Sequence, residues 1–203
     1  MNCILIHGMG RTPLSMLLLY YRLKRAGHCP HLFGYSPAIA ALQQVSQRLI
    51  QTIESITPNQ PYALIGHSLG SVIIRTATRQ LTHHLPQACF FLAPPMVACQ
   101  AARFFARFWL YQLINGEMGQ LLAQDKFMAD LTLPANTKIY IGIGGPQADW
   151  LPFGTQINDG ILSAQEAGLG LQTPVMTVPE IHTFIMNSRM ITEDIIKTLS
   201  QNY

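Results

Sequence analysis

A serine with a glycine two residues before it and another two residues after it is the part of this sequence best suited to chemistry. Residues 66–70 read Gly-His-Ser-Leu-Gly, follow the apolar run from Tyr62 to Ile65 and precede a helix-like segment. A serine on a sharp turn from a strand into a helix adopts a strained backbone conformation, so Gly66 and Gly70 leave space that side chains would otherwise occupy. The amide groups and positive dipole end of the following helix then face the serine, which suits a developing oxyanion. This context predicts that Ser68 is a nucleophile, against the alternative of an ordinary small-residue turn.

A serine hydroxyl becomes a good nucleophile only when a histidine removes its proton and a carboxylate orients that histidine. Of the seven histidines, His182 lies between the last expected strand and the last expected helix, on a loop that can reach the carboxyl edge of a sheet. Three acids could orient it: Asp159, in an Asn-Asp-Gly turn, Asp149, soon after another expected strand, and Glu180. Near neighbours in sequence seldom orient an imidazole well, which disfavours Glu180. Between the two aspartates we favour Asp159 and keep Asp149 open.

An oxyanion needs hydrogen-bond donors, and two backbone amides are candidates. The amide of Leu69 directly follows the serine, and the loop from His7 to Gly10 follows the first expected strand. Glycines in that loop let the backbone approach a carbonyl oxygen closely, and Met9 is its best-placed donor. Taken alone, this loop would more simply be a glycine-rich turn that binds nothing.

Short apolar runs that alternate with longer helix-like segments predict an α/β fold, with a mostly parallel sheet of about six strands flanked by helices. The expected strands are Asn2 to Ile6, His31 to Gly34, Tyr62 to Ile65, Ala88 to Leu92, Lys138 to Ile143 and Pro174 to Val178. The expected helices are Pro13 to Ala26, Ala38 to Ile56, Ser68 to Gln80 and Arg189 to Ser200.

Residues 94–133 interrupt this alternation, because they are longer than the dozen or so residues that a crossover between parallel strands needs. The segment is rich in aromatic residues, among them Phe105 and Trp109. We expect a helical cap whose apolar face lies over the active site, with Phe105 and Trp109 binding substrate. An ordinary crossover helix packed on the core is the alternative.

Composition excludes several classes of protein. The chain has 203 residues, which favours one domain, residues 1–203, with the cap inside it. Only 11% of its residues are charged, against about 25% in typical soluble domains, so some exposed apolar surface is expected. The net charge of +3 comes from scattered lysines and arginines, which argues against nucleic-acid binding. The spacing of the histidines offers no convincing third metal ligand, and we expect neither a metal nor a cofactor.

The cysteines and the N-terminus bear on location. Cys3, Cys29, Cys89 and Cys99 show no metal-binding spacing, and all four are expected to be reduced. No signal peptide is recognisable, and no apolar run reaches the roughly 18 residues of a membrane span. We therefore expect a cytoplasmic protein, with peripheral membrane or lipid contact possible and the oligomeric state open.

Four motifs in register over nearly the whole chain resemble the α/β-hydrolase family, in particular its small bacterial lipase and esterase branch. They are Ile4 to Arg11 (Ile-Leu-Ile-His-Gly-Met-Gly-Arg), Ile65 to Gly70, Asn158 to Gly160, and Pro179 to Thr183. The resemblance implies a minimal α/β-hydrolase fold that lacks the first strands of the family. It implies Ser68 as nucleophile, His182 as base and Asp159 as acid, with the amides of Met9 and Leu69 forming the oxyanion hole. Ser71 departs from the pattern, since the family often has another glycine there.

The expected function is that of a serine hydrolase that cleaves small-molecule carboxylic esters with apolar acyl groups through an acyl-enzyme. Low charge and the aromatic insertion favour apolar acyl groups over charged peptides. An acyltransferase would use the same three side chains, and nothing in the sequence separates the two. A non-catalytic domain that binds a lipid or a protein partner is a third possibility, because a fold does not guarantee activity.

Overall fold

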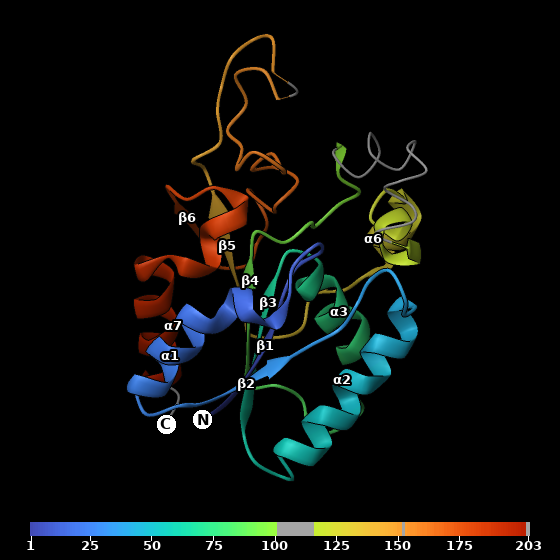
Figure 1. The fold of residues 1–203 in the computed structure, drawn as a ribbon, viewed down its shortest axis with the longest axis vertical. Helices are drawn as coiled ribbons and strands as arrows, with labels where there is room; N and C mark the ends of the chain where they lie inside the picture. The colour runs from blue at the N-terminus through green and yellow to red at the C-terminus, as the bar shows by residue number, and fades with distance from the viewer. Residues whose placement is uncertain (101–115, 152, 202–203) are drawn as a thin grey trace.

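The computed structural model describes residues 1–100, 116–151 and 153–201, and within them six strands form one parallel sheet (Figure 1). The strand order is β2-β1-β3-β4-β5-β6. Their bounds are β1 Asn2–Ile6, β2 Cys29–Phe33, β3 Tyr62–His67, β4 Ala88–Leu92, β5 Thr137–Gly142 and β6 Val175–Val178. Because the strands run in one direction, their carboxyl ends lie at one edge of the sheet, where ligand sites of such sheets form. The expected parallel sheet of about six strands is confirmed.

Helices cover both faces of this sheet. They are the 3₁₀ helices η1 (Pro13–Met16) and η2 (His182–Asn187) and the α-helices α1 (Leu17–Arg25), α2 (Leu42–Ile56), α3 (Leu69–Thr78), α6 (Asp125–Asp130) and α7 (Arg189–Gln201). Helices α1 and α7 pack together on one face, and α2 and α3 pack together on the other (Figure 1).

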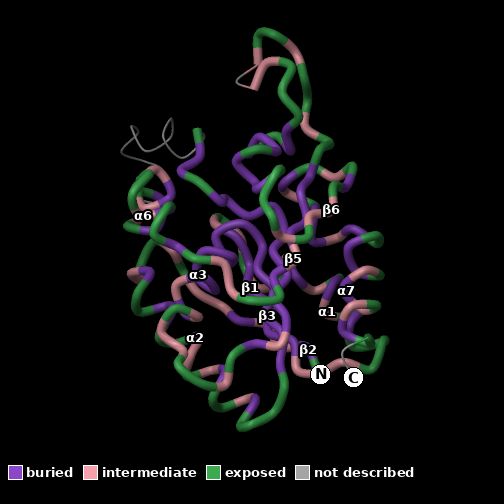
Figure 2. Tube along the Cα trace, turned by 180° about the vertical axis from the view of Figure 1, so that it is seen from behind, coloured by how far each residue is buried: buried purple, intermediate pink, exposed green. Residues whose placement is uncertain are grey.

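Alternate residues of each strand supply the two cores. In β1, Ile4 and Ile6 belong to the cluster that contains α2 and α3, whereas Cys3 and Leu5 belong to the cluster that contains α1 and α7. Successive side chains of a strand point to opposite faces, so a strand covered on both faces is apolar throughout. Figure 2 shows this buried interior along the central strands.

Two of the expected helices become α-helical several residues later than predicted. The segment from Pro13 to Ala26 starts as η1 and becomes α-helical at Leu17. The helix expected from Ala38 begins at Leu42, because the carbonyl of Ser36 accepts the amides of Ile39 and Ala40 in a turn of its own.

A buried arginine holds both stems of the insertion at residues 94–133. Arg75 on α3 is only 2% exposed, and its guanidinium donates to the carbonyl oxygens of Pro95 at 3.3 Å, Met128 at 3.4 Å and Leu131. Burial lowers the pKa of Arg75 to about 10. Pro95 lies at the start of the insertion, and Met128 and Leu131 lie at its end. Both ends are therefore fixed to the helix that follows Ser68.

The expected cap itself remains a prediction. Residues 116–121 are helical and α6 follows them, whereas Phe105 and Trp109 lie outside the described residues.

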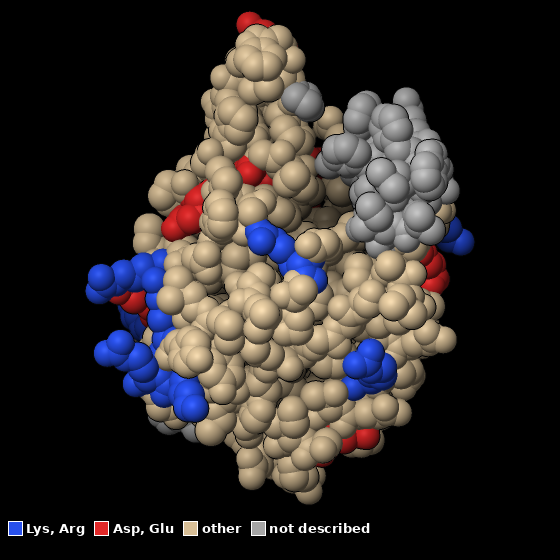
Figure 3. Space-filling view, in the orientation of Figure 1, with Lys and Arg blue, Asp and Glu red and all other residues tan. Residues whose placement is uncertain are grey.

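The surface has few charges, as the composition indicates. Figure 3 shows Lys and Arg gathered mainly on the side of the molecule where α1 and α7 lie. Within the segment between β5 and β6, residues 146–151 and 153–156 extend away from the carboxyl edge of the sheet (Figure 1). Asp149 and Trp150 are exposed there. Cys3, Cys29, Cys89 and Cys99 are free thiols, as expected. Within the described ranges, no helix combines the length and the apolar character that crossing a bilayer requires. Location in the cytoplasm and contact with lipid stay predictions.

Replacing Arg75 by Met should lower the free energy of unfolding by about 2–4 kcal/mol, because three buried carbonyl oxygens lose a charged donor. Arg79→Met is the matched control: Arg79 lies one turn further along and donates to the carbonyl of Asp130 at 3.0 Å in an exposed position. We expect the control to change stability by less than about 1 kcal/mol in urea titrations. Equal losses in the two variants would contradict a special role for the buried arginine.

Candidate active site

Ser68 occupies the turn between β3 and α3 in a backbone conformation that side chains rarely adopt, with φ +49° and ψ −117°. The surrounding glycines make this turn possible. A Cβ on Gly66 would lie 2.7 Å from the backbone of Gly70, and a Cβ on Gly70 would collide with the carbonyl oxygen of Ile6. Such strain, of about 1–3 kcal/mol, persists only where the surrounding structure enforces it.

Ser71 stabilises the same turn. Its buried hydroxyl donates to the carbonyl oxygen of Ser68 at 2.6 Å, and its amide donates to the same oxygen at 2.9 Å. The departure from glycine at this position therefore adds a hydrogen bond and leaves the turn intact.

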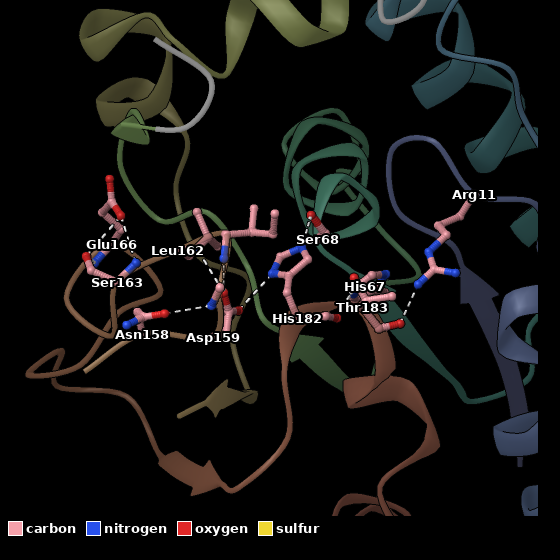
Figure 4. Close-up of polar contacts among 12 residues, drawn as sticks. Arg11, His67, Ser68, Asn158, Asp159, Leu162, Ser163, Glu166, His182 and Thr183 are labelled. Atoms are coloured by element: carbon pink, nitrogen blue, oxygen red, sulfur yellow. Dashed lines mark hydrogen bonds and ion pairs between the residues drawn. The ribbon is translucent and has the colours of Figure 1, made fainter. Parts of the chain in front are cut away.

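Ser68, His182 and Asp159 lie in one hydrogen-bonded row at the carboxyl edge of the sheet (Figure 4). The Nε2 atom of His182 is 3.0 Å from the hydroxyl oxygen of Ser68, and its Nδ1 atom is 2.7 Å from Oδ2 of Asp159. Since a carboxylate only accepts hydrogen bonds, the network assigns the ring proton to Nδ1 and leaves Nε2 to accept from the serine. This arrangement can take a proton from the hydroxyl.

Asp159 is almost fully buried, and its charge is compensated by donors within its own turn. Oδ1 accepts the amides of Ile161 at 2.9 Å and Leu162 at 2.7 Å, while Oδ2 accepts from His182. Asn158 completes the turn by accepting the amide of Gly160 at 2.8 Å. The Asn-Asp-Gly sequence thus performs its ordinary turn chemistry and also presents a carboxylate to His182.

The other two acids that could have oriented His182 do not contact its ring. Asp149 is exposed on the segment between β5 and β6. The ring nitrogens of His182 bond to Asp159 and Ser68, so neither remains for Glu180.

Glu166 is a part of the site that the sequence reasoning missed. It is 7% exposed, and its Oε2 accepts the amide and the hydroxyl of Ser163, while Oε1 accepts the amide of Gln100 at 2.7 Å. Its carbonyl oxygen also accepts the amide of Met96. The Ser-x-x-Glu spacing of residues 163–166 is the signature of a capping box and could have drawn attention to it. Its contacts connect the turn that contains Asp159 to the stretch after β4.

The loop from His7 to Gly10 is held rigidly beside Ser68. The ring of His7 stacks on Tyr35 at 4.3 Å, Nδ1–H donates to the carbonyl of Gly8, and Nε2 accepts the amide of Tyr35. A Cβ on Gly8 would lie 3.1 Å from Cβ of Ser68, so this loop approaches the serine closely. Met9 lies on the loop, and Leu69 opens α3, whose first amides have no partner within the helix. Their roles in an oxyanion hole stay predictions.

Among the residues that the structure describes, no three His, Cys, Asp or Glu side chains gather as a metal site would need.

Residues 17–117 match the model of the Thioesterase domain family. The mature form of a Bacillus licheniformis lipase superposes with a TM-score of 0.72 at 15% identity, over 98% of this chain and 91% of the lipase. An extracellular α/β-hydrolase from a Paenibacillus species superposes with a TM-score of 0.62 at 15% identity, over 97% of this chain and 98% of that protein. An Arabidopsis methylesterase superposes with a TM-score of 0.63 at 14% identity, over 99% of each chain. The protein has the α/β-hydrolase fold. No curated protein sequence matches it.

The resemblance drawn from the sequence motifs is thus confirmed for the fold. Identities of 14–15% to solved structures establish the fold and no substrate, and the roles of Ser68, His182 and Asp159 stay predictions.

The burial of His7 predicts how stability changes with pH. Burial lowers the pKa of His7 from its ordinary value of 6.5, so below that pH the unfolded chain binds a proton that the folded chain does not. The free energy of unfolding should therefore fall as pH falls below 6.5, with His7 contributing at most about 1.4 kcal/mol per pH unit.

Urea titrations at pH 7.5 and 5.5 measure this loss. It should be smaller in His7→Phe than in the unmodified protein, whereas His83→Phe, at an exposed position, should leave it unchanged. An identical loss in His7→Phe and the unmodified protein would contradict the prediction.

Proposed function

We propose that this protein is a serine hydrolase that cleaves carboxylic esters through an acyl-enzyme. The supporting observation is the buried row from Asp159 through His182 to Ser68, which ends on a hydroxyl held at a strained turn between a strand and a helix. A purely structural network would not need a nucleophilic group in a conformation that costs stability.

In the proposed reaction, the hydroxyl oxygen of Ser68 attacks the ester carbonyl carbon while Nε2 of His182 takes the hydroxyl proton. Asp159 keeps the ring oriented and stabilises the imidazolium that forms. The tetrahedral oxyanion accepts hydrogen bonds from the amides of Leu69 and Met9. The intermediate expels the alcohol, which receives the proton from His182. A water molecule, activated by His182, then releases the carboxylic acid and restores Ser68.

Esters of apolar acids are the proposed substrates. The low charge of the chain supports this choice, as do the partly buried Met9 and the buried Met96, which both pack in the apolar cluster beside the site. Phe105 and Trp109 remain proposed substrate-binding residues.

Thioesters are a second candidate substrate class, favoured by the match of residues 17–117 to the Thioesterase domain family. The same steps apply, with a thiol leaving in place of an alcohol. Because an oxyanion hole contacts the carbonyl oxygen, it serves both classes alike.

Hydrolysis of p-nitrophenyl acetate, butyrate, octanoate and laurate, compared with the S-acyl thioesters of the same acids, tests both parts of the proposal. We expect turnover that is lost in Ser68→Ala and a higher kcat/KM for butyrate or longer chains than for acetate. Absence of turnover on all eight substrates would contradict the function. A preference for acetate would contradict the apolar pocket alone, and a preference for thioesters would select the second class.

Replacing Asp159 by Asn should lower kcat by roughly 10³- to 10⁴-fold, because an amide can hold His182 with its proton on the wrong nitrogen. Asp149→Asn is the matched control and should leave kcat within about twofold of the unmodified enzyme. The reverse result, with Asp149→Asn the damaging change, would identify the exposed aspartate as the acid.

A further inference from the structure

The main chain around His182 is held by three hydrogen bonds from three different segments. The amide of His182 donates to the carbonyl of Asp159 at 2.9 Å, and the carbonyl of His182 accepts from Nε2 of His67 at 3.1 Å. The carbonyl of the next residue, Thr183, accepts from Arg11 at 2.5 Å (Figure 4). Together with the two bonds of its ring, every polar group of His182 has a partner.

His67, the residue immediately before Ser68, makes the most unusual of these contacts. Its ring is buried, and its centroid lies 5.1 Å from that of His182. Because Nε2 donates to a carbonyl, the ring proton is assigned to that atom, and Nδ1 is buried without a hydrogen-bond partner. This bare nitrogen faces the loop after β1, since a Cβ on Gly8 would lie only 2.7 Å from it.

A buried nitrogen without a partner costs stability, and a phenyl ring of similar size would fill the same space without that cost. What a histidine provides here and a phenylalanine does not is the single N–H directed at the carbonyl of His182. Gly8 approaches this side of the ring closely.

The donor also has to be uncharged. His182 becomes an imidazolium during the proposed reaction, and a lysine or arginine at this distance would oppose that charge. Burial, and then the proximity of His182, hold the pKa of His67 well below its ordinary value, so His67 stays neutral.

We propose that His67 is a positioning residue: a neutral, fixed hydrogen-bond donor that holds the main chain of His182 so that its ring reaches both Asp159 and Ser68. This proposal rests on the function proposed above. The alternative is that His67 only fills space beneath the turn.

Two substitutions separate these possibilities. His67→Gln keeps an N–H donor of similar reach, whereas His67→Phe keeps the ring volume and removes the donor. In His67→Phe we expect kcat to fall about 10- to 100-fold, with KM within about threefold of that of the unmodified protein. In His67→Gln we expect kcat to be about tenfold or more higher than in His67→Phe. Thermal unfolding of both variants, with His83→Phe as a surface control, shows whether activity merely follows stability.

A second measurement does not depend on turnover. The Nδ1 proton of His182, hydrogen-bonded to buried Asp159, should give a downfield proton resonance in the NMR spectrum of the unmodified protein. We expect this resonance to persist in His67→Gln and to broaden or disappear in His67→Phe.

Persistence of the resonance in His67→Phe, or kcat values that are equal in both variants, would overturn the positioning role. If the unmodified protein hydrolyses nothing but the resonance depends on the donor as expected, the positioning role stands and the proposed function fails.

Discussion

Burying the charge of Asp159 next to His182 is the constraint on which the arrangement of this site depends. A buried carboxylate is tolerated only when hydrogen-bond donors compensate it, and here the donors are the amides of Ile161 and Leu162 and the ring of His182. The first two belong to the same short turn, so the hydrogen bonds of this turn also hold the carboxylate in its buried position. The ring of His182 is then the donor that completes the set, and its other nitrogen is directed at Ser68.

The parallel sheet brings the three side chains of the site together. Ser68 follows β3, His182 follows β6, and Asp159 lies in the segment between β5 and β6, so parallel strands bring all three to one edge. Two buried charged side chains then fix the segments that leave this edge. Arg75 holds both ends of the insertion at residues 94–133, and Glu166 joins the stretch after β4 to the turn that contains Asp159. Main-chain groups are the principal partners of both side chains.

The strands, the turn at Ser68 and the residues that meet there could be predicted from the sequence, because each depends on local patterns. Short apolar runs mark strands such as β1 and β4, whose bounds agree with the prediction at every residue. A serine in so sharp a backbone turn needs glycines nearby for steric reasons, and Gly66 and Gly70 meet this need. The turn at Ser36 that delays α2 was not predictable in this way, since its sequence is also compatible with helix.

The roles of Arg75, Glu166 and His67 could not be predicted either. Each acts through main-chain groups that are far away in sequence: Pro95 and Leu131 for Arg75, Gln100 for Glu166, and His182 for His67. Carbonyl and amide groups are the same at every residue, so no pattern of side chains reveals which of them a buried ion or ring will meet. The choice between Asp149 and Asp159 had the same difficulty, because it depended on the path of a long irregular segment.

The most direct test of the central claim is the rate at which a fluorophosphonate probe labels Ser68, with the modified peptide identified by mass spectrometry. The row of three side chains predicts labelling at Ser68 alone, at a rate that falls by at least about 100-fold in His182→Ala. Labelling that is absent in the unmodified protein, or equally fast without His182, would contradict the claim that this histidine makes the hydroxyl reactive.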